Sequence, residues 1–315
     1  MQTNLELNLL ENAVTPTFAR HETFHPRWGW LKKGFDTASS DCKIFNQEDA
    51  PVKLGVGKNM VRSMRYWCYT FKVIDEDDTP SDFGHNLLGV NGWDTYLENP
   101  ASLWLLHWHL LKPTCNAGAW YYTFNLFNQN EFKKEDLLKG LTSYLQELNK
   151  TVAESSLIKD INCILRMYVE SDNDNINFVE DSIDCPFTEL GLIYQPKNSN
   201  YYHFRFGSKP NLPPEIIVAT CLEYASWVSK NQSTITISRL LYDKGSPGTI
   251  FKLSEEAIYS AIEAVCRQES SLFLADTAGL VQLSFEKNPL DLAYQMLDRF
   301  YGKGKERSYI LISYS

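Results

Sequence analysis

Side chains that could transfer protons gather in one short segment, residues 20–27. The candidate catalytic residues in it are His21, Glu22, His25 and Arg27. Imidazole and carboxylate groups can move protons, and a guanidinium can neutralise a phosphate whose charge grows as a bond breaks. The segment is therefore a candidate centre for cutting a phosphodiester bond. A structural role suits the same residue types, with Glu22 paired to a nearby arginine and His21 capping a turn.

Other reaction classes find little support in the sequence. Gly57 and Lys58 resemble part of a nucleotide-binding phosphate loop, but the required glycine is replaced by Val52 and the required Ser or Thr by Asn59. His107 and His109 are two residues apart in an expected helix, so they point to different sides and cannot share a metal. The scattered, odd set of seven cysteines fits reduced thiols. Neither a nucleophile-elbow serine nor the carboxylate cluster of a metal nuclease is recognisable.

The charge distribution favours a DNA contact in one part of the chain. The net charge of -9 argues against it at first, because phosphate contacts need a basic face. Between Arg20 and Ile74, however, ten Lys or Arg residues stand against five acids. One segment is thus basic within an acidic protein.

This basic segment predicts three helices, at residues 28–38, 49–54 and 58–71. A glycine-containing turn at residues 55–57 between a short helix and a longer one is typical of a helix-turn-helix. The charged residues that recur at helical spacing on the second helix are all basic, and an aromatic residue stands among them. This pattern favours DNA contact over a merely solvated face. The candidate DNA contacts of this unit are Lys53, Lys58, Asn59, Arg62, Arg65, Tyr69 and Lys72.

The middle of the chain predicts a helical unit rich in aromatic residues. The acidic residues 75–86 are expected to form a linker or exposed loop. Helices are then expected at 100–111, 134–148 and 156–169, the last with Ser156 as its N-cap. The Trp and Tyr side chains of this unit favour a buried core over a surface that stacks on bases.

The last unit predicts the element order of a winged helix. A hairpin is expected at 192–195 and 201–206, followed by three helices and two strands at 272–275 and 280–285. The third helix would expose Glu255, Glu256 and Glu263, which repel phosphates, so a scaffold or protein contact is favoured there. The remaining candidate phosphate contacts are Lys244, Ser246 and Lys252.

These patterns together predict a mainly α protein with small β-hairpins, made of tandem helix-turn-helix or winged-helix units. The expected division is a basic helix-turn-helix unit at 1–75, an aromatic-rich helical unit at 87–170, a winged-helix unit at 180–302 and a C-terminal tail at 303–315. A long apolar run and a signal peptide are both missing from the pattern, so a cytoplasmic protein without membrane contact is expected.

Several motifs in one order resemble the SspB family. They are HETF at 21–24, WLKKG at 30–34, LGVGKNMV at 54–61, YW at 66–67, YLENPASLWLLHW at 96–108, GSPG at 245–248 and FKL at 251–253. The similarity covers nearly the whole chain. It implies a component of the Ssp DNA phosphorothioate-modification system of bacterial antiphage defence, in which SspB proteins are described as DNA nickases that open one strand for sulfur insertion.

The resemblance therefore implies a DNA-binding, strand-nicking protein that acts with a cysteine desulfurase, an ATPase and a sulfotransferase-like protein. Mg²⁺ would suit phosphodiester cleavage, although the sequence displays no metal ligands for it. The alternative is a non-catalytic winged-helix DNA-binding adaptor that recruits the sulfur-transfer proteins or regulates transcription. Missing nuclease motifs and the acidic last unit favour this alternative.

Overall fold

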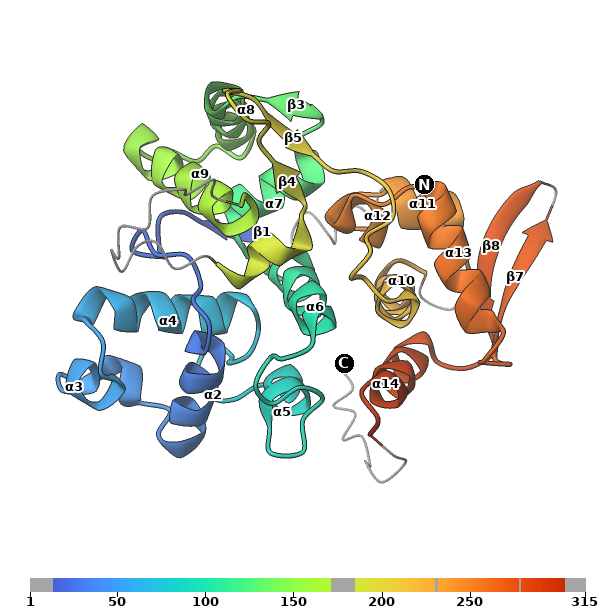
Figure 1. Ribbon diagram of the computed structural model, residues 1–315, viewed down its shortest axis with the longest axis horizontal. Helices are drawn as coiled ribbons and strands as arrows, with labels where there is room; N and C mark the ends of the chain where they lie inside the picture. The colour runs from blue at the N-terminus through green and yellow to red at the C-terminus, as the bar shows by residue number, and fades with distance from the viewer. Residues whose placement is uncertain (1–13, 171–184, 230–231, 278, 304–315) are drawn as a thin grey trace.

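Helices make up most of the chain, and short strands form small sheets among them (Figure 1). The computed structural model describes residues 14–170, 185–229, 232–277 and 279–303. The first elements are β1 (Val14–Thr17), α2 (Trp30–Ser40), the 3-10 helix η1 (Ile44–Asn46), α3 (Ala50–Leu54), α4 (Lys58–Thr70), α5 (Asp82–Leu88), α6 (Pro100–Leu111), β2 (Cys115–Ala117), α7 (Gly118–Tyr121) and the π-helix η2 (Tyr122–Leu126).

The later elements continue the same mixture of helices and short strands. They are β3 (Glu131–Phe132), α8 (Lys134–Glu147), α9 (Glu154–Tyr168), the 3-10 helix η4 (Pro186–Leu190), β4 (Ile193–Tyr194), β5 (Tyr202–Phe204), α10 (Pro214–Val228), β6 (Thr234–Thr236), α11 (Ile237–Tyr242), α12 (Pro247–Phe251), α13 (Glu255–Cys266), β7 (Leu272–Thr277), β8 (Leu280–Phe285) and α14 (Pro289–Phe300).

Helix α6 is the buried centre of the fold. Pro100 occupies its first turn, and the Asn99 side chain caps it by accepting a hydrogen bond from the backbone N–H of Ala101. Every residue from Ala101 to Leu111 is buried. A helix that is apolar all round needs neighbours on every side. Figure 1 accordingly shows α6 between α4 and α10.

The helices that carry the basic segment are the ones the sequence predicts. Helix α3 ends at Leu54 and is capped by Gly55, whose φ of 61° is left-handed and suits glycine, and α4 begins at Lys58. Helix α2 packs against α4 at close range: a Cβ added to Gly34 would lie 2.3 Å from the Sγ of Cys68. This close approach holds α4 with its other face toward solvent.

Two features tie the basic segment to the rest of the chain. Strand β1 pairs in parallel with β2, with Val14 opposite Cys115 and Thr17 opposite Ala117.

The expected linker at 75–86 is wrong in part, because α5 begins inside it. Ser81 caps α5 by accepting a hydrogen bond from the backbone N–H of Gly84.

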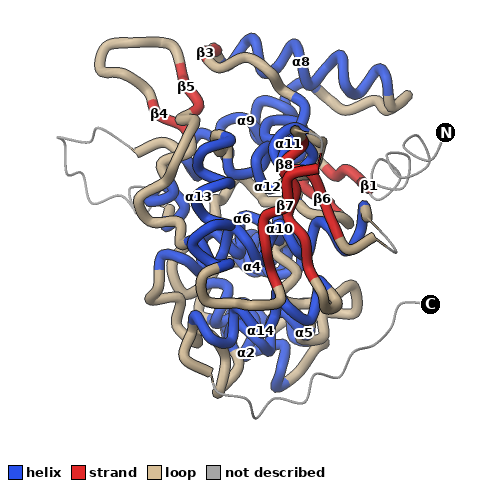
Figure 2. The backbone as a smooth tube through the Cα atoms, turned by 90° about the vertical axis from the view of Figure 1, so that its right-hand side faces the viewer, coloured by secondary structure: helices blue, strands red, loops and turns tan. Residues whose placement is uncertain are grey.

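The later sheets contain the predicted hairpins. Strand β5 pairs antiparallel with both β3 and β4. The other sheet has the order β6-β8-β7, and Figure 2 shows these strands side by side. The predicted N-cap at Ser156 is wrong: α9 begins two residues earlier, at Glu154. Ser254 caps α13, because its side chain accepts a hydrogen bond from the backbone N–H of Ala257.

One buried apolar core extends through the described chain from Trp30 to Leu297. The predicted fold class, mainly α with small β elements, is confirmed. In the part of the chain that is described, every helix is too short or too polar to cross a membrane.

Candidate functional site

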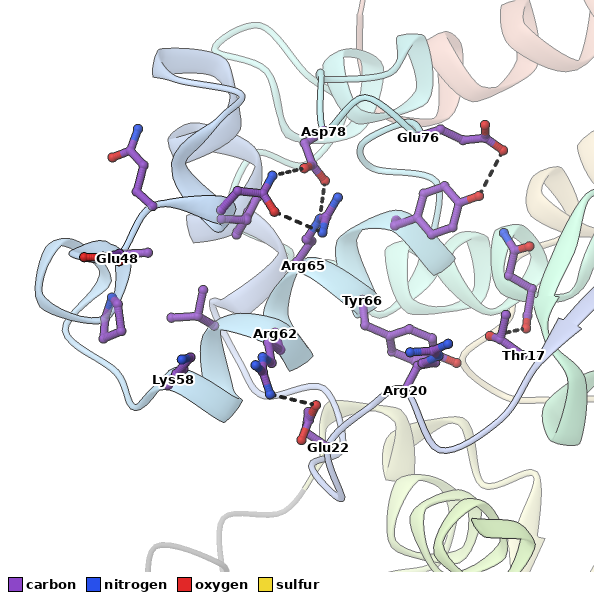
Figure 3. A pocket seen from close by; sticks show the side chains of 18 residues that line it. Thr17, Arg20, Glu22, Glu48, Lys58, Arg62, Arg65, Tyr66, Glu76 and Asp78 are labelled. Carbon is purple, nitrogen blue, oxygen red and sulfur yellow. Dashed lines mark hydrogen bonds and ion pairs between the residues drawn. The ribbon is translucent and has the colours of Figure 1, made fainter. Parts of the chain in front are cut away.

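A groove runs along the exposed face of α4, bounded by the segment before α2 and the loop after α4 (Figure 3). Its volume is about 1090 Å³. The side chains that line it are Thr17, Arg20, Glu22, Phe45, Asn46, Gln47, Glu48, Ala50, Pro51, Lys58, Val61, Arg62, Arg65, Tyr66, Tyr69, Glu76, Asp78 and Asn116. The groove is thus the place where the predicted helix and the predicted polar segment meet.

Opposite charges balance in this groove. Its cations are Arg20, Lys58, Arg62 and Arg65, and its anions are Glu22, Glu48, Glu76 and Asp78. A polyanion would therefore be attracted by the individual cations that solvent reaches and not by a net charge. Arg20, Lys58 and Arg62 are all exposed.

Two arginines of α4 meet acids from other segments. Arg62 Nη1 lies 3.7 Å from Glu22 Oε1, and both side chains are partly exposed. Arg65 Nε donates to Asp78 Oδ1 at 2.6 Å, and the Asp78 side chain is 5% exposed. The first pair is a loose surface pair of small energetic value, whereas the second is short and shielded on the acid side.

A phenol also faces the groove from α4. The Tyr69 hydroxyl donates to Glu76 Oε1 at 3.3 Å. Burial, followed by the negative charge of Glu76, raises the pKa of Tyr69 above its usual value. Tyr69 is therefore a neutral hydrogen-bond donor at physiological pH.

His21 lies in the interior, behind the groove. Its Nε2 is 2.8 Å from Asp160 Oδ1 on α9, and both side chains are almost completely buried. Asp160 also accepts the backbone N–H of Ala19 at 2.9 Å. Burial raises the pKa of Asp160, and the hydrogen bond from His21 opposes that rise. The pair anchors the segment whose neighbouring residues, Arg20 and Glu22, reach the groove.

The other candidate catalytic residues divide in the same way. Glu22 lines the groove, whereas His25 is buried and Arg27 lies over the rings of Phe24 and Trp30. Neither His25 nor Arg27 is part of the groove lining. Of the four candidates, the structure brings only the Glu22 carboxylate to the cations of α4.

The backbone around Glu22 is unusual. Glu22 has a φ of 50° and the next residue, Thr23, a φ of 68°. Two successive residues other than glycine in the left-handed region cost free energy, and such outliers concentrate at functional sites. In this backbone conformation the Glu22 carboxylate lines the groove beside Arg62.

The predicted DNA contacts on α4 share one face. Lys58, Arg62, Arg65 and Tyr69 line the groove, and Asn59 is exposed beside Lys58. The exposed Lys53 lies on α3 and pairs with Asp49 at 3.0 Å.

Lys72 does not continue this face, which corrects the predicted stripe. Helix α4 ends at Thr70, and Lys72 adopts a left-handed φ of 59°. Its ammonium turns inward and donates to the carbonyl oxygens of His109 and Lys112. Burial lowers the pKa of Lys72 to about 7. This lysine joins α4 to α6 and does not point toward solvent.

The candidate contacts in the last unit are corrected in part. Ser246 is completely buried and caps α12 by accepting the N–H of Thr249. Lys252 is also buried, and its Nζ donates to the Phe124 carbonyl oxygen at 2.7 Å. Neither side chain can reach a phosphate in this conformation. Lys244 is exposed.

We expect Lys252→Met to leave DNA affinity unchanged and to alter the pH dependence of stability. Burial lowers the pKa of Lys252 from 10.5 to about 7, so the folded state binds fewer protons than the unfolded state above pH 7. The free energy of unfolding should then rise as the pH increases from 7 to 9. Urea unfolding at several pH values should show a smaller rise for Lys252→Met. An equal rise in variant and wild type would show that Lys252 titrates normally.

Comparison with known proteins identifies the family. Residues 18–301 match the family described as "Protein of unknown function (DUF4007)". A solved structure of magnesium ion-bound SspB is 38% identical, with 95% of this chain and 91% of that chain covered and a TM-score of 0.88. A further SspB crystal structure is 37% identical, with coverages of 95% and 92% and a TM-score of 0.87. The chain belongs to the SspB family. Among curated proteins, no match was found.

One of these SspB structures thus contains a magnesium ion. In the present SspB-family chain, the described residues contain no group of three or more His, Cys, Asp or Glu side chains placed to hold a metal. The groove does offer the separate carboxylates of Glu22 and Glu48, and Glu48 is exposed. Mg²⁺ is often held by one or two carboxylates together with substrate phosphates and water.

Some groove residues of this SspB-family chain were not predicted as site residues. Arg20 opens the same polar segment as His21, so its position in the sequence was a usable signal. Asp78 lies in the acidic stretch that predicted a linker, and its pairing with Arg65 could not be seen there. Asn116 reaches the groove only because β2 pairs with β1, and spacing along the chain gives no sign of it.

Proposed function

We propose that this protein binds DNA along the α4 groove and nicks one strand, as a component of the Ssp DNA phosphorothioate-modification system. The observation that carries the proposal is the meeting of Glu22 with the cations of α4 in one groove. The similarity to SspB supports membership of the Ssp system, and the magnesium ion in one of those structures suits the proposed cleavage of a phosphodiester bond. The cysteine desulfurase, ATPase and sulfotransferase-like components of the system are its proposed partners.

DNA binding is proposed to use α3, the glycine turn and α4 as a helix-turn-helix. Helix α4 presents Lys58, Asn59 and Arg62 in its first turns, and no side chain caps its amino end. Free N–H groups and the helix dipole favour a phosphate there. Gly57, just before the helix, leaves the backbone open to close approach.

The proposed chemistry assigns separate tasks to the groove residues. Glu22 accepts a proton from the attacking water, and Arg20 and Arg62 neutralise the phosphate as its charge grows. The bond from phosphorus to one sugar oxygen then breaks, and that oxygen takes up a proton from solvent. When bound, Mg²⁺ would supply further charge neutralisation and a more acidic water, and the exposed Glu48 carboxylate is the oxygen ligand that the groove offers besides Glu22. His21 is proposed to position this segment from behind and not to contact DNA.

The function is tested by incubating the protein with supercoiled plasmid. We expect open-circular DNA with Mg²⁺ and none with EDTA, because removal of the metal removes a proposed part of the reaction. Glu22→Gln should lose this activity and still shift a duplex in a gel. Relaxation by Glu22→Gln at the wild-type rate would contradict the role of Glu22.

A non-catalytic adaptor is the second proposal, and the surface of α13 favours it. The order α10, β6, α11, α12, α13, β7, β8, with its three-stranded sheet, suits a winged helix that has one extra short helix, α12. Its proposed recognition helix, α13, exposes Glu255, Glu256 and Glu263, which favour a protein partner over phosphates. DNA binding by wild-type protein without plasmid relaxation would support this adaptor.

A further inference from the structure

Arg62 and Arg65 lie on one face of α4, but their acidic ion-pair partners differ in distance and in exposure. The pair of Arg62 with Glu22 spans 3.7 Å, and its side chains are 56% and 33% exposed. The pair of Arg65 with Asp78 spans 2.6 Å, and Asp78 is 5% exposed. Solvent and ligands can reach the first acid far more easily than the second.

The loop after α4 fixes Asp78. The backbone N–H of Asp78 donates to the Asp75 carbonyl oxygen at 3.1 Å, and the N–H of Asp75 donates to the Thr79 carbonyl oxygen at 2.9 Å. The Thr79 hydroxyl also donates to the Asp75 carboxylate at 2.7 Å. Ile74 and Pro80 form a β-bridge that closes the loop. Its backbone thus places the Asp78 carboxylate without help from a ligand.

Asn46 completes a triangle with this pair, and Figure 3 shows Arg65 and Asp78 joined by a dashed line. Arg65 Nη1 donates to Asn46 Oδ1 at 3.4 Å, and Asn46 Nδ2 lies 3.5 Å from Asp78 Oδ2. The Arg65 side chain is still 42% exposed and lines the groove. Within the described residues, its Nη2 has no hydrogen-bond partner. One part of the guanidinium is therefore held while another part faces the groove.

We propose that Asp78 is a positioning residue, which holds Arg65 in the orientation that binds a DNA phosphate, whereas Glu22 competes with phosphate for Arg62. This inference rests on the proposed DNA binding. A guanidinium that is already oriented loses less side-chain entropy on binding, and its fork can hold a carboxylate and a phosphate on different N–H groups. The exposed Glu22 instead occupies the guanidinium that phosphate would take.

The two acids then have opposite effects on DNA affinity, although each substitution removes one negative charge from the groove. We expect Asp78→Asn to weaken binding of a fluorescein-labelled DNA duplex about fivefold, because a neutral acceptor holds Arg65 less firmly. Asparagine also tolerates the left-handed φ of 61° at this position. We expect Glu22→Gln to strengthen binding about twofold. Affinities are measured by anisotropy in EDTA, which prevents cleavage.

Testing Asp78→Asn in a protein that already carries Arg65→Met separates positioning of Arg65 from a general effect on the fold. In Arg65→Met protein, Asp78→Asn should cause no further loss of affinity, because its effect acts through Arg65. An equal loss in both backgrounds would overturn the proposal, as would tighter binding by Asp78→Asn.

Arg65→Lys covers the case in which Asp78→Asn unfolds. Lysine keeps the charge but loses the fork, so it should bind DNA as weakly as Arg65→Met. Wild-type affinity in Arg65→Lys would overturn the proposal. Failure of the wild-type protein to bind any duplex would instead overturn the proposed function itself.

Discussion

Replacing Lys58 and Arg62 together by glutamate is expected to weaken binding of duplex DNA by about two to four orders of magnitude. Each side chain is exposed at the start of α4 and would lose a charge-assisted contact with a phosphate, worth about 1.5–3 kcal/mol. Every 1.4 kcal/mol is about tenfold in affinity. Neither residue has a buried ion-pair partner among the described residues, so melting should be little changed.

The salt dependence of binding identifies the cause. Loss of two phosphate contacts should lower the slope of log affinity against log salt concentration by about two. A matched control is Lys139→Glu with Lys287→Glu, which makes the same change in net charge at exposed positions outside the groove. If the control weakens binding as much as the α4 variant, the α4 face is only a solvated surface and the groove assignment fails.

Asp160→Ala is expected to lower the free energy of unfolding by about 3–5 kcal/mol, because it breaks a buried pair by removing one partner. His21 would then lose the partner of its Nε2, and its Nδ1 already has no hydrogen-bond partner in the described interior. The backbone N–H of Ala19 would lose its acceptor as well. Urea unfolding followed by tryptophan fluorescence measures the change.

Asp160→Asn is the control for this prediction. It keeps an oxygen that can accept from His21 and Ala19, so it should lose clearly less stability than Asp160→Ala. At temperatures at which Asp160→Ala is still folded, its plasmid nicking should be slower than that of the wild type. The reason is that Arg20 and Glu22 flank His21, which has lost its partner. Wild-type stability in Asp160→Ala would show that the pair is not structural, and a direct catalytic role for His21 would regain support.

Local signals along the chain predict much of this fold. Helix α6 begins and ends where its apolar run predicts, at residues 100 and 111, and β8 matches its expected bounds, 280–285. These signals depend on residues within one or two turns of each other. The helical face with Lys58, Arg62, Arg65 and Tyr69 was predictable for the same reason, because helical spacing alone brings these residues together.

Contacts between distant segments could not be predicted in this way. Lysine is usually exposed, so nothing near Lys252 in the sequence predicts its burial. Its partner, the Phe124 carbonyl oxygen, lies 128 residues away in the chain. His21 resembled a catalytic base until its partner Asp160, 139 residues away, was placed. Single-residue chemistry could not distinguish a buried anchor from a proton-transfer group.

The pairing of β1 with β2 and of His21 with Asp160 has a consequence for folding during translation. The segment that carries Arg20 and Glu22, one wall of the groove, is held in place by strand pairing with residues 115–117 and by the contact of His21 with Asp160. Emerging chains fold as their partners become available, from the amino end onward. A nascent chain that has not yet extended to Asp160 therefore displays the basic residues of α4 without this wall. The complete groove therefore forms late in translation, and an unfinished chain lacks the wall on which the proposed DNA cleavage depends.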